Sequence, residues 1–155
     1  MKTQNNRLIK VYENDIKNGA FIIQNNIELI GTQAFQNIEN LTKIVIPHNI
    51  KVIEFAAFDN CQNLIIVAIM NPTCIIGQYA FKHCTSLMLV ELPKKINYIF
   101  EGVFQDCKSL INLTIPDTCT EINLASFLNC TNLKKIKYKN HYYSYDDLLE
   151  YKKFD

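Results

Sequence analysis

The chain has 155 residues, 48% of them hydrophobic, and its 16 basic and 15 acidic side chains nearly cancel. This composition suits the core of one domain, and the small net charge excludes a global attraction to nucleic acid or to a membrane surface. Residues 1–7 are polar and lead into no apolar run long enough for a signal peptide, and no 18 consecutive residues are apolar. We therefore expect a cytoplasmic protein.

The first segment, residues 1–19, has an apolar side that includes Leu8, Val11 and Ile16 but follows no repeat. An end repeat has only one neighbour and must cover the open core with a different sequence. We predict that this segment is an N-terminal cap.

From residue 20 to residue 140 the chain repeats every 23 residues. The step joins three columns of apolar residues: Phe35, Phe58, Phe81, Phe104 and Phe127; Leu41, Leu64, Leu87, Leu110 and Leu133; and Ile30, Ile53, Ile76, Ile99 and Ile122. These columns define five complete units and indicate a repeat protein.

Within each unit, an apolar pair at positions i and i+2 predicts a short strand with one buried face. The pairs are Ile44 and Ile46, Val67 and Ile69, Val90 and Leu92, Leu113 and Ile115, and Ile136 and Tyr138. With residues 21–23, the copies should stack into one parallel sheet of about six strands. Three of these strands are followed by a proline, at Pro47, Pro93 and Pro116. In another unit the proline, Pro72, lies two residues past the corresponding position.

The opposite side of each unit contains the isoleucine and phenylalanine columns. The five phenylalanines are predicted to stack as a buried spine. Two residues after each phenylalanine stands a residue type that tolerates left-handed backbone, which should end a short helical turn. These residues are Asn37, Asn60, His83, Asp106 and Asn129.

The repeat ends after Tyr138. Ser144-x-x-Asp147 can cap a helix running through Asp147 to Lys153, so residues 141–155 are predicted to form a C-terminal helical cap. The two atypical ends favour a single domain with a complete array.

Each unit, written Ile-Gly-x-x-Ala-Phe-x-x-Cys-x-x-Leu-x-x-Ile-x-Ile-Pro, resembles the BspA-type leucine-rich repeat, with the best copies at residues 30–47 and 76–93. The predicted fold is an α/β-type solenoid, a right-handed leucine-rich-repeat superhelix with short helical turns opposite the sheet. The resemblance implies a protein-binding module associated with cell surfaces in anaerobic bacteria and protists. It carries over no catalytic residue.

Four of the six cysteines follow the repeat: Cys61, Cys84, Cys107 and Cys130. Stacked, parallel side chains disfavour both disulfides and the converging ligands that a metal needs, so these are interpreted as small buried residues that donate to nearby carbonyls. Cys119 is expected in the core and Cys74 at the surface. His83 and Cys84 are the one adjacent histidine–cysteine pair, but their columns face different ways. We predict no catalytic site, metal or cofactor.

The outward positions of the strands form the candidate binding surface. The proposed partner-binding residues are Val45, Ile65, Ile66, Ala68, Met88, Leu89, Glu91 and Ile111. A contiguous apolar patch of several hundred Å² marks an interaction site. The alternative is that a cap or a second copy of the chain covers it.

Four lysines make a basic C-terminal end, together with Lys152 and Lys153: Lys134, Lys135, Lys137 and Lys139. No aromatic stacking pattern accompanies them, so a solvated end is favoured over binding to nucleic acid or to an anionic membrane. The leading hypothesis is a non-enzymatic module that binds another protein. The alternative is a self-associating, adhesin-like surface protein.

Overall fold

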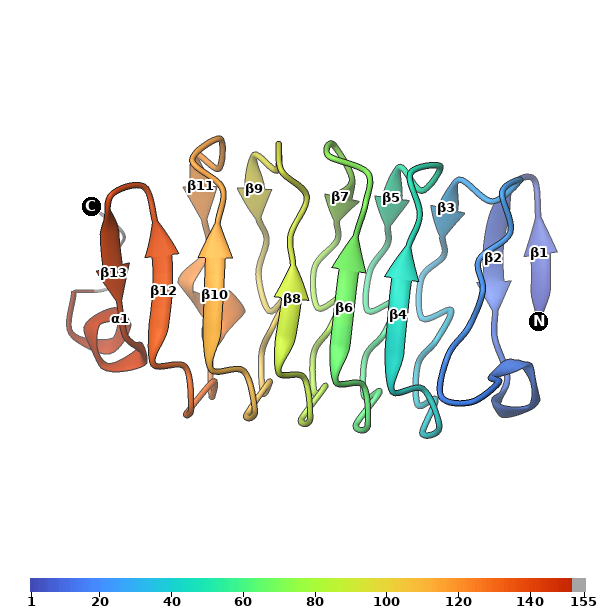
Figure 1. The fold of residues 1–155 in the computed structure, drawn as a ribbon, viewed down its shortest axis with the longest axis horizontal. Coiled ribbons are helices and arrows are strands. Elements are labelled where there is room, and N and C mark those ends of the chain that lie inside the picture. Colours follow the sequence, from blue (N-terminus) through green and yellow to red (C-terminus); the bar gives the residue numbers. More distant parts are fainter. Residues whose placement is uncertain (152–155) are drawn as a thin grey trace.

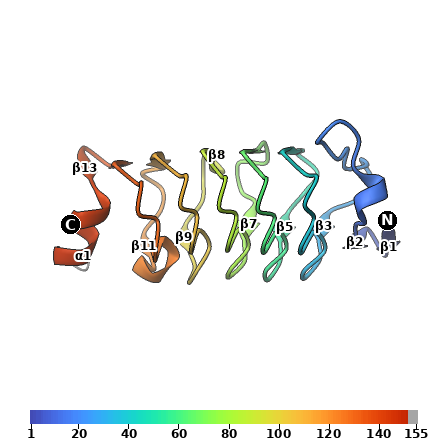
Figure 2. The ribbon, with the colours of Figure 1, turned by 90° about the horizontal axis from the view of Figure 1, so that it is seen from below.

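The structure, a computed structural model, describes residues 1–151 and forms an elongated solenoid (Figure 1). Each full turn places one strand on the front, which we call the strand face, and a two-residue strand on the back, which we call the second face. Seen from below, the turns form a row of similar outlines, with helix α1 at one end and the N-terminal segment at the other (Figure 2). The molecule is a β-rich solenoid with little helix.

The strand face is built by the predicted apolar pairs. Its strands are β4 (Lys43–Ile46), β6 (Ile66–Ile69), β8 (Leu89–Glu91), β10 (Asn112–Ile115) and β12 (Lys135–Tyr138). Parallel pairing sets Ile44 opposite Val67 and Val67 opposite Val90, so the register follows the 23-residue step. Buried and exposed residues alternate along these strands, because one side faces the core.

The prediction of one sheet with about six strands is wrong in two respects. The strand face consists of two separate ladders, β4-β6-β8 and β10-β12-β13, of which β13 (His141–Tyr143) follows the repeats. Residues 21–23 form no strand, although Ala20 makes a single parallel bridge to Lys43. Residues 21–23 therefore have the apolar pattern of a strand but lack the backbone pairing of one.

The second face was not foreseen. It carries β3 (Leu29–Ile30), β5 (Val52–Ile53), β7 (Ile75–Ile76), β9 (Tyr98–Ile99) and β11 (Glu121–Ile122). These strands pair in parallel as β3-β5-β7 and β9-β11. The isoleucine column points inward from them, which explains its burial.

The bends opposite the strand face are hydrogen-bonded turns, and the predicted helical turns are mostly absent among the described residues. Within the repeats, only Leu124–Phe127 forms a 3-10 helix (η2); a second, η1 (Glu13–Asp15), lies near the N-terminus. A left-handed residue stops each bend before a helix can extend, as predicted. The φ angles are 64° at Asn37, 60° at Asn60, 57° at His83, 61° at Asp106 and 60° at Asn129.

The phenylalanine spine is confirmed. Neighbouring rings from Phe35 to Phe127 stack with interplanar angles of 5° to 18° and centroid distances that rise from 4.6 to 6.2 Å. Phe21 closes the N-terminal end of this row with an edge-to-face contact to Phe35 at 5.2 Å. The rings are fully buried and join every repeat to the next.

The cysteine column also packs inward. The thiols of Cys61 and Cys84 donate to the carbonyls of Phe35 and Phe58 at 3.0 and 3.2 Å, and Cys107 and Cys130 make the same contact one and two turns further on. Burial raises the pKa of Cys61 and Cys130 to about 12 and raises the pKa of Cys84 and Cys107 well above its usual value. Cys119 lies in the core as expected.

Cys74 is buried, at 1% exposure, so its predicted exposure is wrong. In other turns the first buried residue of the bend donates its N–H to a proline carbonyl, as Ile50 does to Pro47 and Ile96 to Pro93. In this turn Cys74 donates to Asn71. Because Pro72 lies two residues late, the bend shifts by one residue and Cys74 takes the buried place while Thr73 is exposed.

Both ends differ from the repeats. β1 (Lys2–Gln4) and β2 (Arg7–Lys10) form a hairpin, and β2 adds to the second face with Leu8 opposite Ile30. At the other end, β13 (His141–Tyr143) runs antiparallel to β12, and α1 (Tyr145–Tyr151) follows.

The predicted cap of the C-terminal helix is present, because the Asp147 N–H donates to Ser144 Oγ at 3.2 Å and the Ser144 N–H donates to Asp147 Oδ2 at 2.6 Å. The helix begins at Tyr145, directly after this cap. Its predicted end at Lys153 lies outside the described residues.

The buried thiols predict an alkaline loss of stability. Their pKa is higher in the folded chain than the ordinary value of 9.0, so unfolding releases protons and stability falls as pH rises above about 9. Each thiol should lower the free energy of unfolding by about 1.4 kcal/mol per pH unit in that window. Urea unfolding between pH 8 and 10.5 with a reductant measures the slope.

Cys61→Ala is the control and should make this slope shallower by about 1.4 kcal/mol per pH unit. The same slope in both proteins would show that the Cys61 thiol ionises as readily folded as unfolded.

Candidate functional site

The strand face exposes the residues predicted for partner binding. The exposed side chains, each between 38% and 58% accessible, are Val45, Ile65, Ile66, Met88, Leu89 and Ile111. Glu91 is exposed and Ala68 is half-buried. Register brings them together, because Ile66 lies directly opposite Leu89, and Ala68 lies between Val45 and Glu91.

The chemistry of the strand face changes along the solenoid. From β4 to β8 the outward positions are mainly apolar, β10 presents Asn112 and Thr114, and β12 presents Lys135 and Lys137. All these β10 and β12 side chains are exposed. One surface therefore runs from an apolar to a basic end.

Sequence reasoning missed Ile22, the most exposed large apolar residue of the face at 87%. It lies 23 residues before Val45, so the repeat step itself would have found it. Ile22 and Val45 both line a shallow hollow with Phe21 and Lys43. We define the apolar patch as Ile22, Val45, Ile65, Ile66, Met88 and Leu89.

The basic end includes aromatic rings that the sequence pattern did not reveal. Lys135 Nζ lies 4.3 Å from the centroid of Tyr142, and Lys139 Nζ lies 4.9 Å from that of Tyr138. The antiparallel return of β13 places Tyr142 opposite Lys137. Lys134, Lys135, Lys137 and Lys139 are exposed, whereas Lys152 and Lys153 lie outside the described residues.

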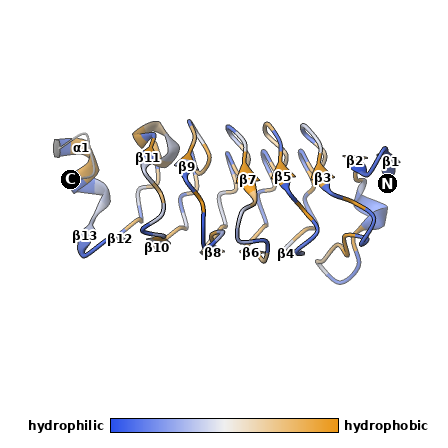
Figure 3. Cartoon of the chain, turned by 90° about the horizontal axis from the view of Figure 1, so that it is seen from above, coloured by the Kyte–Doolittle hydropathy of each residue, from blue (hydrophilic) through white to orange (hydrophobic). Residues whose placement is uncertain are grey.

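The second face carries an aromatic cluster that was also missed: Phe55, Tyr79, Tyr98 and Phe100. The rings of Phe55 and Tyr79 meet edge to face at 5.6 Å, and those of Tyr98 and Phe100 stack at 5.8 Å. Ile75 on β7 is exposed next to them, and the hydrophobic colouring of β5 and β7 marks this face in Figure 3. The signal was the appearance of Tyr79 and Phe100 in columns where other units hold small or polar residues.

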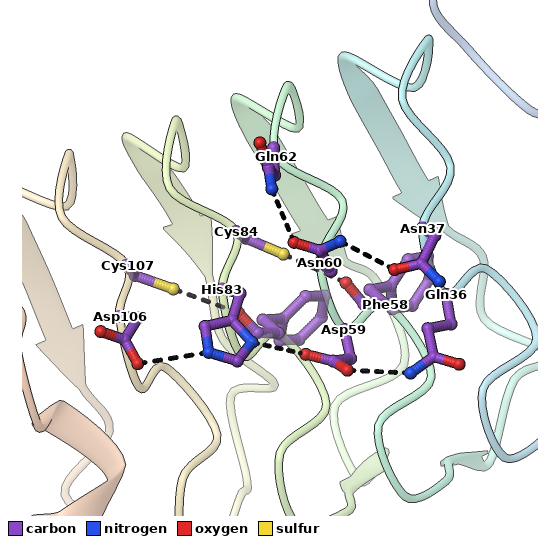
Figure 4. Close-up of polar contacts among 11 residues, drawn as sticks. Gln36, Asn37, Phe58, Asp59, Asn60, Gln62, His83, Cys84, Asp106 and Cys107 are labelled. Carbon is purple, nitrogen blue, oxygen red and sulfur yellow. Dashed lines mark hydrogen bonds and ion pairs between the residues drawn. The ribbon is translucent and has the colours of Figure 1, made fainter.

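A chain of polar side chains crosses several turns at the bends (Figure 4). Gln36 donates to Asp59 at 3.0 Å, and the His83 ring lies between Asp59 and Asp106, with Nδ1 3.0 Å and Nε2 3.5 Å from their carboxylate oxygens. Asn129 donates to the other oxygen of Asp106 at 2.9 Å. These contacts link neighbouring turns and so fix their spacing.

His83 and Cys84 do not form a nucleophilic pair. The Cys84 thiol points inward to the Phe58 carbonyl, whereas His83 faces the two carboxylates (Figure 4). Burial keeps the pKa of Cys84 well above its usual value, which disfavours the reactive thiolate. Among the described residues, no group of three or more metal-binding side chains converges, and no helix there is long and apolar enough to cross a membrane.

The chain resembles two solved leucine-rich repeat structures. One is a leucine-rich repeat protein of T. pallidum, 25% identical with a TM-score of 0.72, in an alignment covering 76% of this chain and 57% of that protein. The other is a leucine-rich cell surface protein of Faecalibacterium prausnitzii A2-165, 29% identical with a TM-score of 0.79, covering 87% of this chain and 35% of that protein. A comparison with curated protein sequences found no match.

Fold and repeat together define a leucine-rich repeat solenoid, a class of typically non-catalytic proteins that generally serve as protein-interaction modules. A family model for the BspA type leucine-rich repeat region matches residues 10–134 in six copies, and the chain belongs to this family. The sequence pattern gave five complete units.

The aromatic cluster predicts an unusual cost at Gly102. A Cβ there would lie 2.2 Å from the Tyr79 ring, although the left-handed backbone, at φ 66°, is shared by Gln33, Ala56 and Tyr79 in the same column. Gly102→Ala should displace the ring and cost about 2–4 kcal/mol in urea unfolding, about 1 kcal/mol from the left-handed backbone and about 1–3 kcal/mol from the overpacking.

In a Tyr79→Ala background the same change should cost only about 1 kcal/mol, the penalty of the left-handed backbone. Equal costs in both backgrounds would show that the ring is not the obstacle.

Proposed function

We propose that this protein is a non-catalytic module that binds another protein through its strand face. The observation that carries the proposal is the apolar patch, which remains exposed although the strands that present it bury their inward residues. Contiguous apolar surface on this scale marks interaction sites. The residues proposed for contact are the patch together with Ala68, Glu91 and Ile111.

The polar and basic end of the same face sets the expected character of the partner. Apolar anchors bind best in a desolvated centre, while charged groups at the rim guide encounter and orientation. A partner that packs an apolar surface on Ile66 and Leu89 and places acidic groups near Lys135 and Lys137 would match both parts. Nucleic acid is a less suitable partner, because the large exposed side chains of the apolar patch carry no charge.

The segments at the two ends of the solenoid are proposed to cover its core. Residues 1–19 and the segment from residue 141 are taken as caps: Leu8 and Val11 are buried at one end, and Leu148 is buried at the other. Tyr145 Oη also accepts the Asn129 N–H at 3.2 Å, which joins α1 to the last repeat. On this proposal, five full units lie between the two caps.

A place at the cell surface is part of the proposal, because the similar Faecalibacterium protein is described as a cell surface protein. The second candidate function is self-association of adhesin-like copies through the same patch. It is favoured by Ile22, whose near-complete exposure at the edge of the patch leaves an apolar side chain for another copy to cover.

Introducing charge into the patch tests partner binding. Ile66→Asp combined with Leu89→Asp should reduce capture of a specific partner from the source cell by at least about tenfold, equivalent to about 1.4 kcal/mol. Ile75→Asp combined with Tyr98→Asp is the matched control, since these exposed residues lie on the second face. Circular dichroism and thermal unfolding verify that both variants fold.

Capture by the patch variant at the level of the control variant and of the unmodified protein would place the binding site elsewhere. Light scattering across a concentration series separates the two candidates: a persistent monomer contradicts self-association, whereas a dimer that the patch variant abolishes supports it.

A further inference from the structure

One interface between turns lacks the backbone hydrogen bonds that its neighbours have. We call it the central junction, the contact between residues 72–93 and residues 95–116. On the strand face, the N–H groups of Met88, Leu89, Lys134 and Lys135 donate to the preceding turn at 2.9–3.2 Å. Within residues 1–151, the equivalent N–H groups of Ile111 and Asn112 make no such bond.

The second face is interrupted at the same place. Glu54, Gly77 and Asn123 donate their N–H groups to the preceding turn at 2.7–2.9 Å, whereas Phe100, in the same column, has no backbone partner among the described residues. Both strand ladders end here, since β8 does not pair with β10 and β7 does not pair with β9. Two independent ladders thus stop between the same two turns.

The bend opposite the strand face remains joined across the junction. Tyr79, Phe81 and His83 donate their N–H groups to Glu101, Val103 and Gln105 at 2.9–3.1 Å. The Ser109 N–H donates to Thr85 at 3.1 Å, and one bond, from Lys95 to Pro72, persists at the far turn. The His83–Asp106 contact crosses the junction at the bend as well (Figure 4). The connected side therefore lies along the phenylalanine and cysteine columns.

The sequence gives a reason for the interruption. The late Pro72 shifts the bend that ends at Cys74 by one residue, and this shifted bend faces the regular bend of the next turn. This mismatch weakens pairing at the central junction.

The core is less well covered at this junction. Val90 and Leu92 are 7% and 8% exposed, whereas Leu113 and Ile115 on the next strand are 2% and 1% exposed. A hollow of about 380 Å³ lies between β8 and β10, and another of about 360 Å³ lies between β7 and β9.

We propose that the central junction is a hinge at which the solenoid flexes about its joined bend, so that the strand face opens and closes between Leu89 and Asn112. The two parts on either side keep continuous ladders and move as units. The hinge lies at the border of the apolar and polar parts of the strand face. Its movement changes the curvature of that face without unfolding a turn.

Hydrogen exchange on the unmodified protein gives the first test. The amides of Ile111, Asn112 and Phe100 should exchange at least about 100-fold faster than those of Met88, Leu89 and Gly77, which occupy the same columns in the preceding turn. Residue-resolved NMR provides these rates. Exchange within about threefold of the column partners would contradict the hinge.

Distance distributions give the second test and distinguish movement from a static gap. Nitroxide labels at Val45→Cys and Glu91→Cys span two turns without crossing the junction, and labels at Glu91→Cys and Lys137→Cys span two turns across it. Both pairs should lie about 10 Å apart from strand spacing. The six native thiols are buried, so the introduced cysteines take the label.

The label distances are measured from dipolar broadening. The distance distribution of the Glu91–Lys137 pair, which crosses the junction, should be at least about twofold wider than that of the Val45–Glu91 pair. Equal widths would overturn the hinge. Neither test uses a binding partner, so the outcome is independent of the proposed function.

Discussion

Each turn of this solenoid can bury its apolar side only against the turns before and after it, and that constraint governs the structure. It requires residues of one type to recur at a fixed step, so that Phe58 meets Phe35 and Phe81 at one depth and each buried thiol reaches the carbonyl of the preceding turn. A change in one column affects two interfaces. The inward positions are thus committed to packing, and recognition is left to the outward positions.

Sequence reasoning succeeded where a side chain's role depends on the repeat. The Phe81 ring, the Cys84 thiol and the left-handed His83 backbone were predictable because column partners supply the same information several times. It failed where the position of a residue depends on backbone pairing between neighbouring turns. Strands such as Val52–Ile53 are too short to show periodicity, so the second face was missed, and the one-residue shift that buried Cys74 came from backbone geometry after a displaced proline.

The candidate site was also only partly predictable. Exposure of Ile66 and Leu89 followed from alternation along a strand, and the same rule with the 23-residue step would also have placed Ile22 outward. The break between β8 and β10 depends on three-dimensional contacts between turns that share the same consensus. The change from apolar to polar surface and the proposed hinge therefore coincide at the central junction, which the regular repeat in the sequence does not reveal. A partner that binds on both sides of the central junction would also stabilise one curvature of the strand face.

The central claim is that the scaffold columns build the fold while the outward residues of the strand face make the contacts. Site-specific photo-crosslinking in the source cell tests it most directly, with a photoreactive residue at Leu89 on the strand face or at Glu121 on the second face. The account predicts a discrete crosslinked protein from position 89 and none from position 121. Crosslinks from position 121 alone would contradict it.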